Sequence, residues 1–190
     1  MQHYGAPTRL LDWTESPLAA LYFAVTDHDG KRDAAIWILD PTWLNRQLGK
    51  GVEGPMLPDW VEAEPYLPDL EEAFEGREVR VRLPAAIEPA HVDRRLAAQA
   101  SRFVIFGTTR DLMKTKAARV TGSRRHIGMF RIPKERVADA QNELVRYGVT
   151  TAALFPDLIG LGTELSSKWK KPSQLFSREP GAKGQARCQD

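Results

Sequence analysis

Apolar residues recur at strand and helix spacings along the first 50 residues, with turn-forming residues between the segments. Residues 8–13 predict a short strand. The Ser16-Pro17 pair predicts a helix start, because serine caps helix N-termini and proline is tolerated at the first helical position. Apolar residues then recur from Leu18 at i, i+3, i+4 and i+7, which predicts a helix face turned to the core.

The run AAIWIL at residues 34–39 is apolar at every position, which predicts a central strand buried on both faces. Asp40 and Pro41 repeat the cap-and-proline pattern ahead of a short helix that extends to Leu48. Residues 49–68 are rich in Gly and Pro and have no clear period, so they are expected to form an extended loop.

The second half continues the alternation of strands and helices. EVRVRLP from Glu78 alternates as a half-exposed strand does, and a helix is expected over residues 89–100. RFVIFGT and HIGMFRIP predict two further strands. KERVADAQNELVRYG predicts an amphipathic helix closed by Gly148, and PDLIGLGTELSSKW predicts the last ordered element.

These elements predict an α+β (mixed α/β) single domain over residues 1–171, with a central mixed sheet of five to seven strands flanked by helices. Residues 172–190 are polar and are expected to form a flexible tail. No apolar run approaches the ~20 residues of a membrane span, so no membrane partner is expected. The single cysteine, Cys188, offers neither a disulfide nor a metal cluster, which favours a cytoplasmic location and predicts no metal.

The net charge of +2 is mild, but the charged residues are unevenly spread. Residues 53–78 are acidic and residues 110–136 are basic. Both stretches have a simple interpretation as solvated surfaces. Alternatively, the basic stretch meets the phosphates of a nucleotide or a nucleic acid, with Arg124 and Arg125 as the candidate contacts.

The opening segment holds the best candidate site residues, since the chain has no Walker A loop, G-x-G-x-x-G, G-x-S-x-G or H-E-x-x-H motif. In a strand over residues 8–13, Arg9 and Trp13 share one face and Asp12 lies on the other. A buried charge is costly unless it is paired. Arg9 and Asp12 therefore either have partners in the core or line a polar cleft. Asp12 and Thr14 are equally suited to fasten the turn into the helix.

Two later segments have a similar mixture of polar and apolar residues. Arg95 and Gln99 are i, i+4 neighbours and would share one face of a helix, which is either a solvated face or part of a site. Asp157 stands at a predicted helix start, where capping is its simplest role. Glu164 follows two turns later and is expected to be solvated.

Together these segments resemble the FRG domain family. QHYGAPTRLLDWTESPLAALYFAV is similar to the family signature, and the spacing of Arg95, Gln99 and Phe103 and the segment LFPDLIGL match its later motifs. The resemblance implies that His3, Tyr4 and Thr8 of the signature belong to a ligand site. The Phe/Tyr-Arg-Gly motif of the family would precede Gln2. We therefore expect weaker binding, or a partner polypeptide or homodimer that completes the sheet.

The layout of this family is similar to that of ADP-ribosyltransferases, which implies NAD as a ligand. In that scheme Arg9 anchors the pyrophosphate, Tyr22 stacks on the nicotinamide, and Gln99 or Glu164 contacts the ribose. Two functions stay open. One is an NAD-using ADP-ribosyltransferase-like or NAD-glycohydrolase effector of a toxin or phage-defence system. The other is a non-catalytic nucleotide-, nucleic-acid- or protein-binding module.

Overall fold

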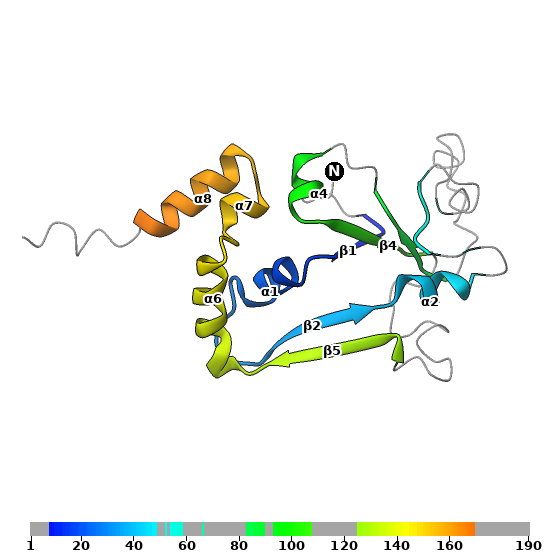
Figure 1. Cartoon of the computed structure of the whole chain (residues 1–190), viewed down its shortest axis with the longest axis horizontal. Coiled ribbons are helices and arrows are strands. Elements are labelled where there is room, and N and C mark those ends of the chain that lie inside the picture. The colour runs from blue at the N-terminus through cyan, green and yellow to red at the C-terminus, as the bar shows by residue number, and fades with distance from the viewer. Residues whose placement is uncertain are drawn as a thin grey trace, which may run out of the picture.

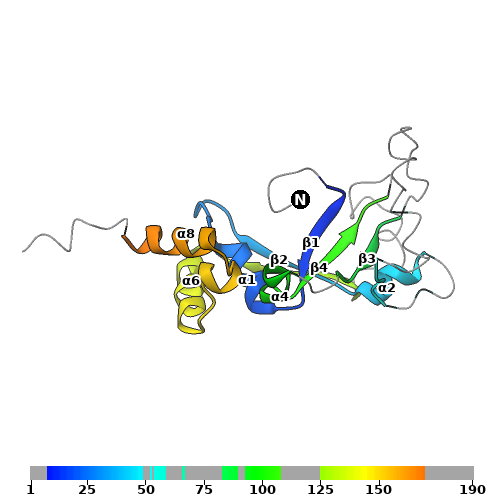
Figure 2. The same ribbon diagram turned by 90° about the horizontal axis from the view of Figure 1, so that it is seen from above.

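The computed structural model describes residues 8–48, 52, 54–58, 66, 83–89, 93–107 and 125–169. The predicted α+β class is confirmed. The elements are β1 (Leu10–Thr14), α1 (Pro17–Val25), β2 (Ala34–Leu39), α2 (Pro41–Arg46), β3 (Ala85–Ile87), α4 (Arg94–Ala98), β4 (Ser101–Ile105), β5 (Ile127–Ile132), the 3-10 turn η5 (Lys134–Arg136), α6 (Val137–Arg146), α7 (Thr151–Leu154) and α8 (Leu158–Trp169). Figures 1 and 2 show α6, α7 and α8 gathered at one end of the molecule and α2 and β3 at the other.

The described strands form two small antiparallel sheets, whereas the sequence predicted one central mixed sheet. The first has the order β1-β4-β3 and the second pairs β2 with β5. The consecutive strands β1 and β2 thus lie in different sheets, and helix α1 between them contacts both. As a result β2 has a single strand neighbour among the described residues. Trp37 and Ile38 of β2 are each 47% exposed, so the predicted burial of this strand on both faces is wrong.

Buried residues gather in three apolar clusters. The largest joins α1 to β2, α6 and α7 through Tyr22, Val25 and Leu144, among others. On α1 the predicted core residues Tyr22 and Val25 are buried, but Ala19 is buried in place of Leu18, which is exposed. A second cluster joins α2 to one face of β3 and β4. A third lies on the opposite face of these strands and includes Met56 and Tyr66.

Local capping signals set most helix starts. The Ser16 hydroxyl accepts a hydrogen bond from the Ala19 N–H, as predicted for the start of α1. Helix α4 begins only after Asp93, whose carboxylate accepts from the backbone N–H groups of Arg95 and Leu96. The predicted start at residue 89 is therefore wrong, because the Asp93 cap decides the boundary. The predicted loop over 49–68 and the strand from Glu78 lie largely outside the described residues.

Along the described residues, no helix has both the length and the apolar character that crossing a bilayer requires.

Helix α8 packs against the end of α7 through Gly160. A Cβ at this position would overlap the carbonyl oxygen of Phe155, whereas a Cβ at Gly162 on the same helix would meet nothing within 4 Å. We expect Gly160→Ala to lower the free energy of unfolding by about 2 kcal/mol through overpacking. Gly162→Ala should raise it by up to about 1 kcal/mol, since alanine favours helix. Equal thermal midpoints for the two variants would contradict this packing.

The carboxylate of Asp40 caps α2, and its pKa is lowered mainly by the hydrogen bond from the backbone N–H of Trp43. His126, whose Nδ1 lies 2.9 Å from the carboxylate, lowers the pKa further, while partial burial opposes both effects. Because the folded pKa is below the unfolded value of 3.8, the stabilisation is present above pH 3.8 and is lost as the pH falls below it.

The loss of stability between about pH 5 and pH 2 should therefore be smaller in Asp40→Asn than in the unmodified chain. Urea unfolding at each pH measures the two slopes. Identical slopes would show that Asp40 adds no pH-dependent stability.

Candidate functional site

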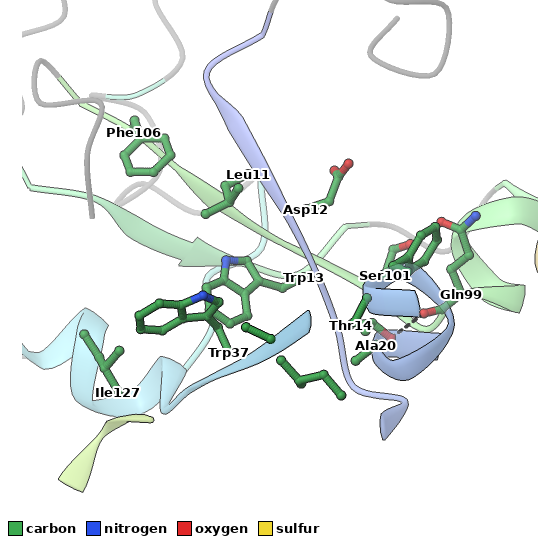
Figure 3. A pocket seen from close by; sticks show the side chains of 14 residues that line it. Leu11, Asp12, Trp13, Thr14, Ala20, Trp37, Gln99, Ser101, Phe106 and Ile127 are labelled. Atoms are coloured by element: carbon green, nitrogen blue, oxygen red, sulfur yellow. Dashed lines mark hydrogen bonds between the residues drawn. The ribbon is translucent and has the colours of Figure 1, made fainter. Parts of the chain in front are cut away.

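A cleft of about 730 Å³ opens between the two sheets and α1. Residues 11–14 of β1 form one side, and residues of α1, β2, β4 and β5 complete it, together with Gln99 after α4 and Phe106 after β4. Figure 3 shows these side chains around β1. The lining residues are Leu11, Asp12, Trp13, Thr14, Ala20, Phe23, Ala24, Ala35, Ile36, Trp37, Gln99, Ser101, Phe106 and Ile127.

Most of the lining is apolar, and four of its fourteen residues are aromatic, namely Trp13, Phe23, Trp37 and Phe106. Trp13 comes from the first sheet and Trp37 from the second, and Figure 3 shows Leu11 and Trp13 on the same side of β1 as Trp37. Phe23 and Trp37 are each about half exposed although both are large and apolar. Exposed aromatic faces in a concave site favour a flat, apolar group as the ligand.

The polar lining residues are Asp12, Thr14, Gln99 and Ser101. Gln99 is only 9% exposed, and its side-chain amide donates to the Leu154 carbonyl at 3.0 Å. The Thr14 hydroxyl donates to the backbone carbonyl of Gln99 at 2.6 Å and accepts from the Ser16 N–H at 2.9 Å. Thr14 thus fastens the turn into α1, as predicted, and also fixes Gln99 against β1.

Asp12 is the single acidic residue of the lining, and its side chain is exposed. It lies on the opposite face of β1 from Leu11 and Trp13, as the alternation of the strand requires (Figure 3). Within the described part of the chain, no three His, Cys, Asp or Glu side chains are grouped as ligands of a metal ion would be.

Arg9 lies beside the cleft rather than in its lining. Its guanidinium is half-buried and donates to the backbone carbonyl of Phe106 at 3.2 Å and to the carbonyl of Tyr66. These bonds fix the backbone of Phe106, which lines the cleft. The sequence allowed Arg9 either to have partners in the core or to line a polar cleft. The structure supports the first alternative, because the guanidinium is hydrogen-bonded to two backbone carbonyls.

The other predicted site residues are spread over the helical end of the chain. Tyr22 is buried, and its hydroxyl is hydrogen-bonded to the Thr151 hydroxyl at 2.8 Å. The Arg95 guanidinium lies 4.3 Å from the centre of the Phe155 ring. Neither Tyr22 nor Arg95 lines the cleft.

Two acidic residues near α8 have structural partners. Asp157 accepts from the Gly160 N–H at 2.7 Å, which confirms its predicted capping role. Glu164 accepts from the Ala152 N–H at 2.8 Å, so the prediction that it is solvated is wrong. The Glu164 carboxylate on α8 thus binds the first turn of α7. This contact depends on how α8 packs against α7.

The remaining predicted site residues lie away from the cleft or outside the described ranges. The Thr8 hydroxyl accepts from the Leu10 N–H at 3.3 Å, and Arg125 is exposed. His3, Tyr4 and Arg124 lie outside the described residues.

Several lining residues were not predicted from the sequence. The sequence predicts Trp37 in a strand buried on both faces, because an apolar run does not reveal how many neighbours the strand will have. Ser101 begins β4 and Phe106 follows its last residue, and neither belongs to a motif of its own. A tryptophan within a short apolar strand is the one signal in the sequence that could have pointed to Trp37.

Comparison with known proteins supports the resemblance at the start of the chain. The family model described as FRG domain matches residues 1–33. This segment contains β1 and α1, and it supplies seven of the fourteen lining residues of the cleft, from Leu11 to Ala24. No curated protein and no solved structure matches the chain.

Proposed function

We propose that the cleft binds the nicotinamide–ribose end of NAD and that the chain is an ADP-ribosyltransferase-like protein or NAD glycohydrolase. One observation carries the proposal: the segment similar to the FRG domain supplies half the lining of a cleft that combines Trp13, Trp37, Phe23 and Phe106 with the carboxylate of Asp12. An effector of toxin or phage-defence type would act in this way by depleting NAD.

The lining fits one end of NAD better than the other. Aromatic walls suit the nicotinamide ring, and the carboxylate of Asp12, on the opposite face of β1 from Trp13, would suit the positive charge that develops on the ribose. The fourteen lining residues include no Arg or Lys, so the pyrophosphate would lie outside the cleft. Arg9, the predicted anchor, lies beside the cleft, since its guanidinium donates a hydrogen bond to the backbone carbonyl of the lining residue Phe106.

Bound NAD supplies a nicotinamide leaving group, whose departure places positive charge on the ribose. The carboxylate of Asp12 lies on the other face of β1 from Trp13 and would stabilise that charge from this second side of the cleft, because opposite charges attract. The aromatic side chains would exclude bulk water and orient the ring. Gln99 is held by two hydrogen bonds and would keep the polar side of the cleft in place.

Trp37→Ala should weaken NAD binding about tenfold, since stacking on an aromatic ring contributes about 1–3 kcal/mol. Calorimetric titration measures the affinity, and chromatography of released nicotinamide measures turnover. Trp169→Ala is the matched control, because Trp169 is also exposed and lies outside the cleft lining.

If Trp37→Ala and Trp169→Ala bind NAD equally, the cleft is not the NAD site. If NAD binds in a Trp37-dependent manner but no nicotinamide is released, the binding-module function replaces the enzymatic one. If NAD neither binds nor is consumed, both forms of the proposal are wrong.

A further inference from the structure

Apolar side chains are uncovered on both faces of the β2–β5 sheet. Trp37 shares one face with Met129, and Ile38 shares the other with Phe130. Met129 and Phe130 are 51% and 63% exposed, and both β2 residues are 47% exposed. A two-stranded sheet is only marginally stable alone, so a further strand would support the sheet, and its side chains could cover part of this apolar surface.

The outer edge of this sheet is β5. Figure 1 shows β2 between β5 and α1, with β5 along the border of the molecule. In the part of the chain that the structure describes, β5 pairs with β2 and with no other strand. The backbone groups on the outer edge of a strand are a template for pairing with another strand.

We propose that two copies of the chain pair antiparallel through β5, about a twofold axis at Met129, to give a four-stranded sheet. The register follows from shape. A Cβ on Gly128 would meet no atom within 4 Å, so there is open space above this residue. Pairing about Met129 places the partner's Phe130 opposite Gly128, where its ring fills that space and covers Ile38.

Charge also permits this register. Arg131 is the single charged residue of β5, and the pairing places it opposite Ile127 of the partner subunit instead of the partner's Arg131. Like charges directly opposite one another would destabilise the pair. Met129 and Trp37 lie on one face, so the pairing would also lengthen the apolar wall that Trp37 contributes to the cleft.

The size of the surface predicts a weak dimer. Met129, Phe130 and Ile38 would bury roughly 100 Å² each, or about 600 Å² over two copies, which is below the ~1,200 Å² of stable interfaces. The dimer should therefore form and dissociate with protein concentration.

Disulfide trapping tests the register in the full chain carrying Cys188→Ser. Residues opposite each other across antiparallel strands have Cα atoms about 4.5–5.5 Å apart, within the range of a disulfide. Met129→Cys should give covalent dimers at least about tenfold faster than Arg131→Cys. Arg131 is the matched control, because it lies on the same strand and face and its side chain is 70% exposed, yet it does not meet its own copy.

Sedimentation equilibrium supplies an independent measurement. The mass should rise with concentration from 21.3 kDa toward twice that value, and Phe130→Lys should abolish the rise while leaving the circular dichroism spectrum unchanged. Equal trapping rates for Met129→Cys and Arg131→Cys would overturn the register. A constant mass of one chain up to millimolar concentration would overturn the dimer, whatever the fate of the Phe130 variant.

Discussion

Asn45→Ala is expected to lower the free energy of unfolding by about 3–4 kcal/mol, the largest stability effect of any substitution considered. Asn45 is 0% exposed and belongs to α2, and its hydrogen bonds join this helix to β3. Its side-chain amide donates to Gly54 at 2.6 Å and to Ala86 at 2.9 Å, and its carbonyl accepts from the Ala86 N–H at 2.7 Å.

The amide of Asn45 thus pairs with the backbone of β3 as a neighbouring strand would. The Ala86 carbonyl keeps a second donor, the Met56 N–H, so the main loss on substitution is an unsatisfied Ala86 N–H and a small cavity. For a chain of this length the thermal midpoint should fall by about 10 °C. Asn142→Ala on the exposed face of α6 should leave the midpoint nearly unchanged.

Asn45→Asp separates hydrogen bonding from size. The new carboxylate would keep the acceptor for Ala86 but lose both donors, and it would be fully buried. Burial raises a carboxyl pKa above its unfolded value, so this variant should regain stability as the pH falls toward 4. Equal destabilisation at pH 4 and pH 7 would show that the side chain is not buried as described.

Local signals in the sequence were sufficient for several elements of the fold. The Ser16-Pro17 and Asp40-Pro41 pairs each mark a helix that begins where predicted, because capping depends on residues within one turn. Helix α4 was placed too early, since Pro89 and Asp93 are both plausible starts and only the hydrogen bonds of Asp93 decide between them.

Long-range contacts account for what the sequence did not predict. The apolar run of β2 has the composition of a central strand, and its true exposure depends on how many strands lie beside it. Glu164 and Ala152 are twelve residues apart, and only the turn between α7 and α8 brings them together. The cleft likewise joins residues from 11 to 127. The sequence therefore predicted Asp12 as a candidate site residue, but it did not predict that Phe23, Trp37 and Phe106 line the same cleft.

Asp12→Asn is expected to lower the rate of nicotinamide release by about 100-fold or more, with a much smaller effect on NAD affinity. Asparagine has nearly the same shape as aspartate, so the packing of β1 should be retained. The substitution removes the single negative charge of the lining. A charge that stabilises the developing cation matters most in the transition state, so the rate should fall more than the binding does.

Asp139→Asn is the matched control, because Asp139 is an exposed carboxylate on α6 outside the cleft. Calorimetry and nicotinamide release measured on both variants separate binding from turnover. A parallel loss of affinity and rate in Asp12→Asn would assign Asp12 to ligand binding alone. Unchanged turnover would remove the carboxylate from the chemistry, because no other residue of the cleft lining carries a negative charge that could replace it.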